Sequence, residues 1–335
     1  MAEVAPGSEE LVLAFLAEAV DEFVSGEAIS GKLGLSRAAV WKHVNALRAQ
    51  GYGIEAVAAR GYRLVAIPDR LGPLEIGPLL NTHDLGQVLH CADELPSTND
   101  RARELADEGA AHGEVVIAES QTAGRGRRGR SWASPPGRNL HLSVILRPQL
   151  PPQRAAELTL LASVATCDAC RQAGVDAGIK WPNDVLVGGR KVAGILTELS
   201  AEPEVVHWVV VGIGVNLNAG PDDFPPGVRE IATSLAEARG QPVPRALFTA
   251  ALLASLEQWL DVHAAEGFGP VREAWRERSV TLGREVRVES DGVEVAGVAE
   301  DVDASGALLV RTASGVARVV SGDVRLLHRV DPGGA

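Results

Sequence analysis

Cysteine is scarce in this chain, and its three cysteines cannot build a disulfide framework. Cys91 stands by itself, whereas Cys167 and Cys170 form a CxxC inside an alanine-rich stretch that predicts a helix. A metal or redox role there would need a second pair of ligands, so buried small residues on one helix face are the better interpretation. The low cysteine content favours a cytoplasmic protein.

Long apolar runs are also missing. None approaches the roughly 20 residues that cross a bilayer, and the first ten residues are acidic, without a signal-peptide pattern. Apolar residues make up 46% and charged residues 23% of the 335 positions, which is typical of globular proteins with two or three domains. The sequence therefore predicts no membrane contact.

Basic residues are fewer than acidic ones, and lysine in particular is rare. The formal net charge is −12, so the protein as a whole should repel nucleic acid, and any DNA contact must come from a local basic patch. Of the 32 basic residues only four are lysines: Lys32, Lys42, Lys180 and Lys191. A lysine in such an arginine-rich chain is a candidate for a place that needs a compact ammonium group.

Helical periodicity dominates the first 50 residues. Residues 9–25 predict an amphipathic helix, and two shorter helices follow over 27–33 and 37–49, the last capped by Ser36. Two short apolar runs around a turn within 54–64 then predict a hairpin. This order of elements predicts a winged helix-turn-helix domain over residues 1–66.

Basic side chains concentrate in this domain. Residues 26–64 hold six basic and two acidic side chains, whereas residues 1–25 hold six acidic and no basic ones. A helix that starts with Ser-Arg can offer its N-terminus to the major groove of DNA. The DNA-binding candidates are Ser36, Arg37, Lys42 and Arg60. Protein–protein contact through the same winged helix is the alternative.

The rest of the chain predicts a linker and two further domains. Proline and glycine mark residues 67–84 as the linker. Residues 85–280 alternate between strands and helices; the alternating run 140–146 predicts a half-buried strand, and the apolar run 205–211 predicts a central one. The glycines within 212–216 are not part of a GxGxxG that opens a helix, so a Rossmann interpretation of them fails. Five short runs within 281–330 predict an SH3-like barrel.

The segment Gly124 to Arg130 places four arginines and three glycines in seven residues. Glycine lets the backbone approach a ligand, and each guanidinium offers a donor fork for phosphate or carboxylate. Four like charges repel and nothing local neutralises them, so we expect a mobile loop that orders on binding an anion. The alternative is a surface tract that binds nucleic acid without specificity.

Other candidate groups fall at the predicted strand ends around this loop. They are neutral polar residues (Ser97, Thr98, Asn99, Gln121), the compact Lys191, a turn with Asp184, glycines that allow close approach (Gly194, Gly212, Gly214), and Trp132, which could cover an apolar ligand. Cations that converge on one pocket suit a polyphosphate held beside a carboxylate. The residues thus indicate an enzyme that activates a carboxylate or handles a phosphoryl group.

Five motifs, in order and spacing, resemble the biotin protein ligases. They are Ser-Thr-Asn at 97–99, Gln-Thr-Ala-Gly-Arg-Gly-Arg-Arg-Gly-Arg at 121–130, Lys-Trp-Pro-Asn-Asp at 180–184, Arg-Lys-Val-Ala-Gly-Ile-Leu at 190–196 and Gly-Ile-Gly-Val-Asn at 212–216. The Ser-Arg-Ala-Ala-Val-Trp-Lys-His helix and Arg-Gly-Tyr wing resemble the bifunctional ligases that also repress biotin operons. The resemblance implies a multidomain α+β fold with a class II synthetase-like catalytic domain.

The resemblance also implies a reaction and a set of site residues. Biotin and ATP, with Mg²⁺, would give biotinyl-5′-AMP, and the biotinyl group would pass to a lysine of the biotin carboxyl carrier domain of acetyl-CoA carboxylase. Lys191 and Arg127 would act in catalysis, Asp184 is a possible metal ligand, and loop 219–227 would order over adenine. The ligand would contact Ser97, Thr98, Asn99, Gln121, Gly124, Arg125, Gly126, Arg127, Trp132, Lys191, Gly194, Gly212, Gly214 and Asn216.

The resemblance further implies a homodimer, promoted by the acyl-adenylate, that binds a palindromic operator. Three alternatives stay open at the level of the sequence. The protein could be a ligase whose winged helix has no regulatory role, a non-catalytic repressor that senses biotinyl-adenylate, or a related lipoate-type ligase. An intact Lys191 and arginine loop argue against a mere sensor.

Overall fold

The computed structural model describes residues 7–19, 22–290 and 292–329. It divides the chain into two units, Met1–Arg70 and Leu71–Ala335. No helix in the described part of the chain is both long enough and apolar enough to cross a membrane.

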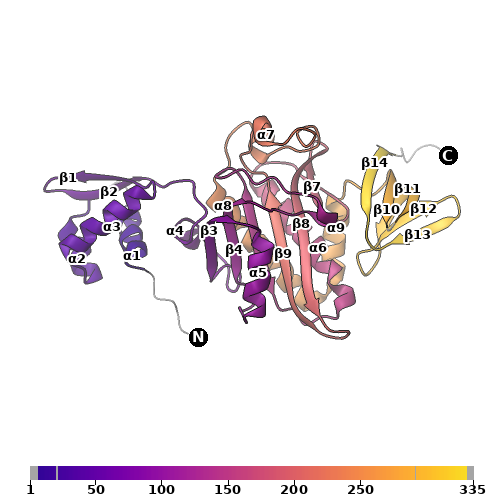
Figure 1. The fold of residues 1–335 in the computed structure, drawn as a ribbon, viewed down its shortest axis with the longest axis horizontal. Coiled ribbons are helices and arrows are strands. Elements are labelled where there is room, and N and C mark those ends of the chain that lie inside the picture. The colour runs from indigo at the N-terminus through magenta and orange to yellow at the C-terminus, as the bar shows by residue number, and fades with distance from the viewer. Residues whose placement is uncertain (1–6, 20–21, 291, 330–335) are drawn as a thin grey trace. The chain divides into compact units, whose positions relative to one another are not determined.

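The first unit is a winged helix-turn-helix domain, as predicted (Figure 1). Its elements are α1 (Ser8–Glu18), α2 (Gly26–Leu33), α3 (Arg37–Ala49), β1 (Gly53–Val57) and β2 (Gly61–Ala66), the two strands being paired antiparallel. Its core is made of fully or almost fully buried aliphatic side chains: Val12, Leu16, Ile29, Val40, Val44 and Leu47. The apolar face of α3 thus packs inward, which leaves its polar face available.

The first helix is shorter than its periodicity predicts. Helix α1 ends at Glu18 instead of continuing to residue 25, and part of the predicted range (residues 20 and 21) lies outside the described residues. Val24 forms an antiparallel bridge with Tyr62 of the wing, with both backbone N–H to O distances at 2.8 Å. Pairing with a distant strand therefore outcompetes helix formation at this point.

The second unit contains a seven-stranded mixed sheet with strand order β3-β4-β5-β9-β8-β7-β6. Its strands are β3 (Leu89–Leu95), β4 (Val115–Gln121), β5 (Leu140–Leu146), β6 (Gly178–Lys180), β7 (Asp184–Val187), β8 (Arg190–Ala201) and β9 (Val206–Val215). Strand β9 lies between β5 and β8, which confirms the central position predicted from its apolar run.

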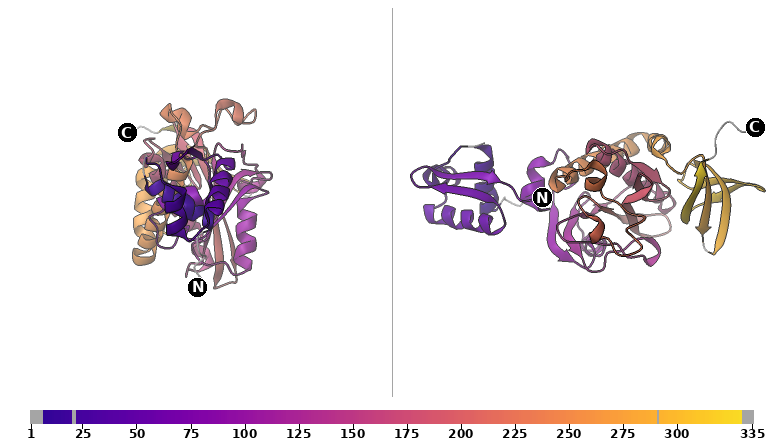
Figure 2. Two further views of the ribbon diagram at one scale, coloured as in Figure 1. Left: turned by 90° about the vertical axis from the view of Figure 1, so that its left-hand side faces the viewer. Right: turned by 90° about the horizontal axis from the view of Figure 1, so that it is seen from above.

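Helices cover both faces of this sheet. Helix α5 (Thr98–Asp107) packs on β4, β5 and β9, whereas α6 (Ala156–Gln172), α8 (Arg245–Glu266) and α9 (Phe268–Arg278) form a layer on the opposite face (Figures 1 and 2). Because of this double cover, all seven residues of β5 are buried. The prediction of a half-buried strand at 140–146 was therefore wrong.

The C-terminal part of the second unit is a five-stranded antiparallel sheet, in the order β13-β12-β11-β10-β14. Its strands are β10 (Arg284–Ser290), β11 (Val293–Val302), β12 (Leu308–Thr312), β13 (Gly315–Val319) and β14 (Asp323–Arg329). Its buried side chains join the same hydrophobic cluster as the seven-stranded sheet, and Trp181 Nε1 donates to the carbonyl of Gly306 at 3.0 Å. The two sheets of this unit therefore share one core.

The remaining elements of the second unit are short. They are α4 (Pro73–Ile76), α7 (Leu235–Arg239) and the 3₁₀ turns η1 (Gly77–Leu79), η2 (Arg127–Gly129), η3 (Pro152–Arg154) and η4 (Pro221–Asp223).

Within the range 67–84, which the sequence marks as a linker, residues from Leu71 onward belong to the second unit. Leu71 and Ile76 are buried, and Leu71 N donates to Glu119 Oε1 at 2.8 Å.

The wing offers a test of how strongly Gly61 contributes to the stability of the first unit. Gly61 has φ +106°, and a Cβ at this position would collide with the carbonyl of Val24. We expect Gly61→Ala to destabilise the unit by about 3 kcal/mol or more, because left-handed strain and a backbone clash add together. Gly34→Ala is the matched control, since Gly34 has φ +66° with open space around it; it should cost only about 1–2 kcal/mol. Hydrogen exchange in residues 22–66 measures both, and equal effects would contradict the prediction.

Candidate ligand pocket and nucleic-acid interface

A buried cluster of neutral polar groups lies where β3 leads into α5. Ser97 precedes the helix, and Thr98 and Asn99 lie in its first turn; all three are at most 4% exposed. Ser143 Oγ of β5 lies 2.8 Å from Thr98 Oγ1 and 2.7 Å from Asn99 Oδ1, and Gln121 Oε1 accepts from Thr98 N at 2.8 Å. The cluster can meet the hydrogen-bonding groups of an uncharged ligand.

Gly212 is required next to this cluster. A Cβ at Gly212 would overlap the Oδ1 atom of Asn99, so only glycine permits the observed packing. Asn99 Nδ2 donates to Glu198 Oε2 at 2.7 Å and to the Leu196 carbonyl at 3.2 Å. Helix α5 and the centre of the sheet are therefore joined through the side chain of Asn99.

Trp132 covers two further glycines of the sheet. A Cβ built on Gly214 would lie 2.6 Å from the Trp132 indole, and one on Gly194 would lie 3.2 Å from it. Gly124 approaches the Trp132 carbonyl and the Gln121 side chain in the same way, at 2.7 and 3.0 Å. The indole therefore rests directly on backbone, as the predicted close approach at Gly194 and Gly214 requires.

Lys191 lies beside this indole and is held by a carboxylate. Its Nζ is 2.5 Å from Asp184 Oδ1 and 5.4 Å from the Trp132 ring centroid. Lys180 Nζ is 3.8 Å from the other oxygen of Asp184, and burial, the largest influence, lowers the pKa of Lys180. Asp184 thus bridges two ammonium groups at the start of β7.

The arginine loop is neutralised by distant carboxylates. Arg125 donates to both oxygens of Asp100, at 2.7 and 3.0 Å, and lies 3.5 Å from Glu198. Arg130 pairs with Asp323 at 2.7 Å, and Arg128 lies 3.6 Å from the same carboxylate. As expected, no local group neutralises these arginines; the carboxylates that pair with Arg125, Arg128 and Arg130 come from α5, β8 and β14. Gly126 N closes the loop by donating to the Arg130 carbonyl at 2.7 Å.

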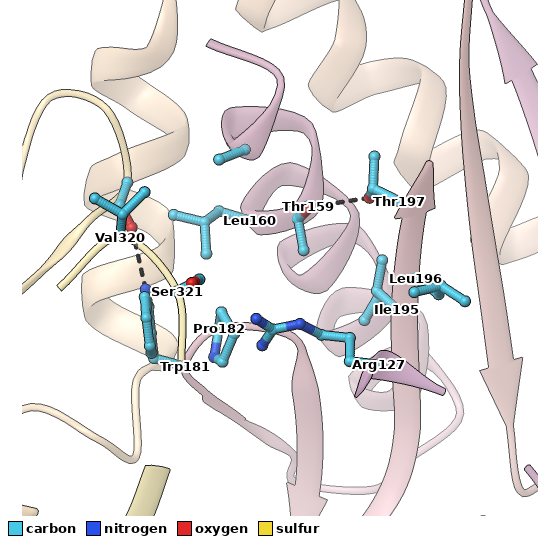
Figure 3. Close-up of a pocket in the computed structure, with 12 residues that line it drawn as sticks. Arg127, Thr159, Leu160, Trp181, Pro182, Ile195, Leu196, Thr197, Val320 and Ser321 are labelled. Atoms are coloured by element: carbon cyan, nitrogen blue, oxygen red, sulfur yellow. Dashed lines mark hydrogen bonds between the residues drawn. The ribbon is translucent and has the colours of Figure 1, made fainter. Parts of the chain in front are cut away.

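Arg127 differs from its neighbours, because none of its hydrogen-bond partners is a carboxylate. Its Nη1 lies 3.3 Å from both Asn183 Oδ1 and the Gly322 carbonyl, and burial is the largest influence lowering its pKa. The guanidinium points into a cavity of about 220 Å³ (Figure 3). The cavity is lined from α6, β8 and the C-terminal sheet, for example by Thr159, Thr197 and Ser321.

Asn216 and the segment that follows it are held to the sheet by hydrogen bonds. Asn216 is 4% exposed; its Nδ2 donates to the Thr233 carbonyl at 3.1 Å, and its carbonyl accepts from Leu235 N at 3.0 Å. Lys191 N donates to the Ile231 carbonyl at 2.7 Å. The chain from 216 to 235 is therefore tied to the strand that carries Lys191.

Several residues around the polar cluster and the arginine loop were missed by the sequence analysis: Asp100, His141, Ser143, Glu198, Asp323, and Ser134, whose Oγ accepts from Gln121 Nε2 at 3.2 Å. Ser143 and His141 carried a usable signal, because they are the two polar residues that alternate with Leu140, Leu142 and Val144. The acidic residues carried none, since their function as counterions appears only once strands and helices distant in sequence are packed together.

In the first unit, the four DNA-binding candidates lie on exposed positions. Ser36 Oγ accepts from Ala39 N at 3.1 Å and so caps α3 at its N-terminus, next to Arg37. Arg60 stacks on Phe23, with 4.2 Å from its guanidinium carbon to the ring centroid. Trp41, on α3 beside Lys42, is 60% exposed and was not among the candidates.

Comparison with known proteins agrees with this arrangement. Three family models match: the biotin/lipoate A/B protein ligase family at residues 92–216, an HTH domain at 9–63, and the biotin protein ligase C-terminal domain at 281–327. A bifunctional ligase/repressor BirA of Bacillus subtilis is 41% identical over 94% of this chain and 97% of its own length. The chain belongs to the bifunctional biotin ligase and repressor family.

Two further similar proteins are more distant, and each covers less of the chain. The bifunctional ligase/repressor BirA of Escherichia coli is 33% identical over 91% of this chain and 93% of its own. The solved biotin protein ligase of Aquifex aeolicus in complex with biotin and ATP has a TM-score of 0.64 and 28% identity, covering 72% of this chain and 99% of that one. The fold class predicted from the sequence is confirmed by these matches and by the sheets described above.

Asp323 offers a test of how the arginine loop is held. Asp323→Asn removes the charge that Arg128 and Arg130 share, so we expect faster hydrogen exchange in residues 124–131 of the ligand-free protein. The free energy of unfolding should change by no more than about 1 kcal/mol, because these pairs are partly exposed. Glu289→Gln is the matched control, since Arg128 uses the Glu289 carbonyl rather than its side chain. Unchanged exchange in Asp323→Asn would show that the loop does not depend on this carboxylate.

Proposed function

We propose that this protein activates biotin with ATP to form biotinyl-5′-AMP, transfers the biotinyl group to a lysine of a carboxyl carrier domain, and represses transcription through its winged helix. The observation that carries the proposal is the meeting of three kinds of group at one sheet: a neutral polar cluster, the Lys191 ammonium and the arginine loop. Family membership across nearly the whole chain supports it.

The neutral cluster would hold the uncharged bicyclic head of biotin. A ureido group offers one carbonyl and two N–H groups, and Ser97, Thr98, Asn99 and Gln121 can supply complementary donors and acceptors. The four side chains are themselves uncharged, which suits an uncharged ligand, because a buried, unneutralised charge would be costly. Gly212 lies next to this cluster, where the Asn99 side chain leaves no room for a Cβ.

The cations would serve the reacting end of the ligand. A biotin carboxylate oxygen attacks the α-phosphorus of ATP, and the bond from that phosphorus to the bridging oxygen breaks, releasing pyrophosphate. Lys191 would place its point charge between carboxylate and α-phosphate oxygens and offset their repulsion. Arg127, whose hydrogen-bond partners are neutral oxygens, can turn to the phosphates without losing a direct ion pair. Arg125 would have to exchange its ion pair with Asp100 for a phosphate.

Trp132 and the Gly124–Gly126 segment would close over the mixed anhydride and exclude water. Asn216, with the ordered chain after it, would border the adenine, and the 219–227 loop would complete that side. The lysine amine of the carrier domain then attacks the anhydride carbonyl, and AMP leaves. Water exclusion matters because hydrolysis of the anhydride would waste ATP.

The described part of the chain does not form a cage for Mg²⁺ from its own side chains. The described residues contain no group of three or more His, Cys, Asp or Glu side chains that could hold a metal ion, and Asp184 is engaged by two lysines. A magnesium ion would therefore enter with the phosphates of ATP, keeping mostly phosphate and water ligands. The possible metal role of Asp184 is less well supported than its role in positioning Lys191.

A free strand edge offers a place for macromolecular partners. The pairing of β7 with β8 ends at Asp184 and Gly194, and beyond Ile195 no described strand pairs with that side of β8. Leu199, on this free stretch, is 41% exposed. Such an edge can pair with a strand of a second copy or of the carrier domain, which supports both the homodimer and the carrier domain as partners.

The ligase activity is tested directly by mass spectrometry of an isolated carrier domain after incubation with the protein, ATP and biotin. We expect one biotinyl adduct on a single lysine, dependent on both substrates. No adduct would reject the ligase and favour an adenylate-sensing repressor. A lipoyl adduct in place of a biotinyl one, with lipoate supplied, would favour the lipoate-type alternative.

Lys191→Arg tests the need for a point charge. We expect biotin-dependent pyrophosphate release to fall about 10²–10³-fold, the usual loss when one preorganised charge at a developing anion is removed. The reason is that the planar guanidinium fork cannot occupy the space beside Asp184 and Trp132. Arg190→Lys is the matched control on the neighbouring residue, which pairs with Glu237 at the surface, and should keep the parent rate. A near-normal rate in Lys191→Arg would reject this role.

DNA binding separates the bifunctional protein from a ligase with a non-regulatory winged helix. We expect the biotinyl-AMP-loaded protein to bind DNA upstream of biotin genes, with affinity falling as salt rises. Arg37→Ala should reduce the slope of log K against log[salt] by about 1 per copy, and Arg171→Ala, on the second unit, should leave it unchanged. No binding at low salt would reject the repressor function.

A further inference from the structure

Two aromatic side chains of the pocket keep polar atoms without hydrogen-bond partners. Among the described residues, the buried unpaired atoms include Trp132 Nε1 and both ring nitrogens of His141. His141 is only 1% exposed. A buried donor or acceptor without a partner lowers the stability of the folded protein, so three such atoms in one region call for another explanation.

Strand register places His141 at the floor of the pocket. On β5 it points to the same face as Ser143, and away from the core-facing Leu140 and Leu142, because side chains alternate along a strand. Its direct partner on β9 is Gly214. Trp132 Nε1 lies 2.8 Å from the position a Gly214 Cβ would take. Opposed Cβ positions are roughly 5 Å apart, so the imidazole lies beside the indole.

The environment keeps this imidazole neutral. Burial, and secondarily the charge of Arg245, lower the pKa of His141 to about 4. A neutral imidazole has one nitrogen that donates and one that accepts. It can therefore bind an uncharged polar group without competing with Lys191 for the carboxylate or the phosphate.

The neighbouring polar groups have already used much of their capacity. Thr98, Asn99, Gln121 and Ser143 bond to one another or to the sheet in the ligand-free protein. His141 has an unused donor and an unused acceptor on the same face of the sheet. A ligand that brings both kinds of group would satisfy it.

Building on the function proposed above, we propose that His141 is a further specificity-determining residue, whose imidazole hydrogen-bonds the ureido group of bound biotin. The cost of its unpaired nitrogens in the free protein is then recovered when biotin binds. Loss of these nitrogens should raise the stability of the ligand-free protein and lower its affinity for biotin. A purely structural histidine would not produce this combination.

His141→Phe keeps a buried ring and removes both nitrogens. We expect the ligand-free variant to unfold at a higher temperature than the parent, and the Kd for biotin alone, measured by calorimetry without ATP, to rise about tenfold, the loss of one or two hydrogen bonds. The KM for ATP should stay unchanged. Trp275→Phe is the control, since it removes another buried, unpaired N–H from α9, outside the pocket, and should leave the Kd for biotin unchanged.

His141→Gln supplies a second measurement that does not depend on the stability of the Phe variant. Glutamine retains a donor and an acceptor, so its Kd for biotin should lie within about threefold of the parent value. A parent-like Kd in a folded His141→Phe, a Gln variant as weak as Phe, or an equal rise in the KM for ATP would each overturn the proposal. Failure of the parent protein to bind biotin at all would instead reject the proposed function.

Discussion

The pairing of pocket cations with carboxylates of the protein is the interaction on which the rest of this site depends. Lys191 rests on Asp184, Arg125 on Asp100, and Arg130 on Asp323. Without these carboxylates, several positive charges on one loop and one strand would repel one another. In the proposed reaction, ligand binding would therefore be an exchange of partners, in which phosphate and carboxylate oxygens replace side-chain carboxylates. The affinity reflects only the difference between the two sets of contacts.

That exchange requires the backbone of the sheet to be reachable, and the register of β5, β9 and β8 provides this. Gly212 faces Ser143 and Gly214 faces His141 across one pair of strands, and Gly194 faces Gly214 across the next. Removal of Cβ at these three positions creates a shallow path over the sheet, now occupied in part by the Trp132 indole. A single methyl group on Gly212 or Gly214 would close this path, even with all the surrounding cations in place.

The sequence predicted the fold class and most elements, because helix caps, alternation and glycine turns are local signals. It could not predict where the first helix ends, since Val24 is recruited by Tyr62 of the wing, which lies nearly forty residues later. It also could not identify Asp100, Glu198 or Asp323 as counterions, because each lies far from the arginines in sequence. Strand 140–146 looked half-buried because His141 and Ser143 are polar, yet both face a covered pocket. The polar residues of this strand are therefore buried and do not face solvent.

The first unit shows why DNA binding and association of two copies should be linked. Of the six lysines and arginines within residues 26–64, Arg48 donates to the Ile54 carbonyl, Arg63 pairs with Glu55 and Lys32 pairs with Glu18. Arg37, Lys42 and Arg60 are left to face phosphates, which limits one copy to a salt slope of roughly −3 at about 0.9 per phosphate. Such a small electrostatic contribution gives weak binding for a protein whose net charge is −12. Two copies on a palindrome would double the contacts, so an event that favours dimerisation would also determine whether the operator is occupied.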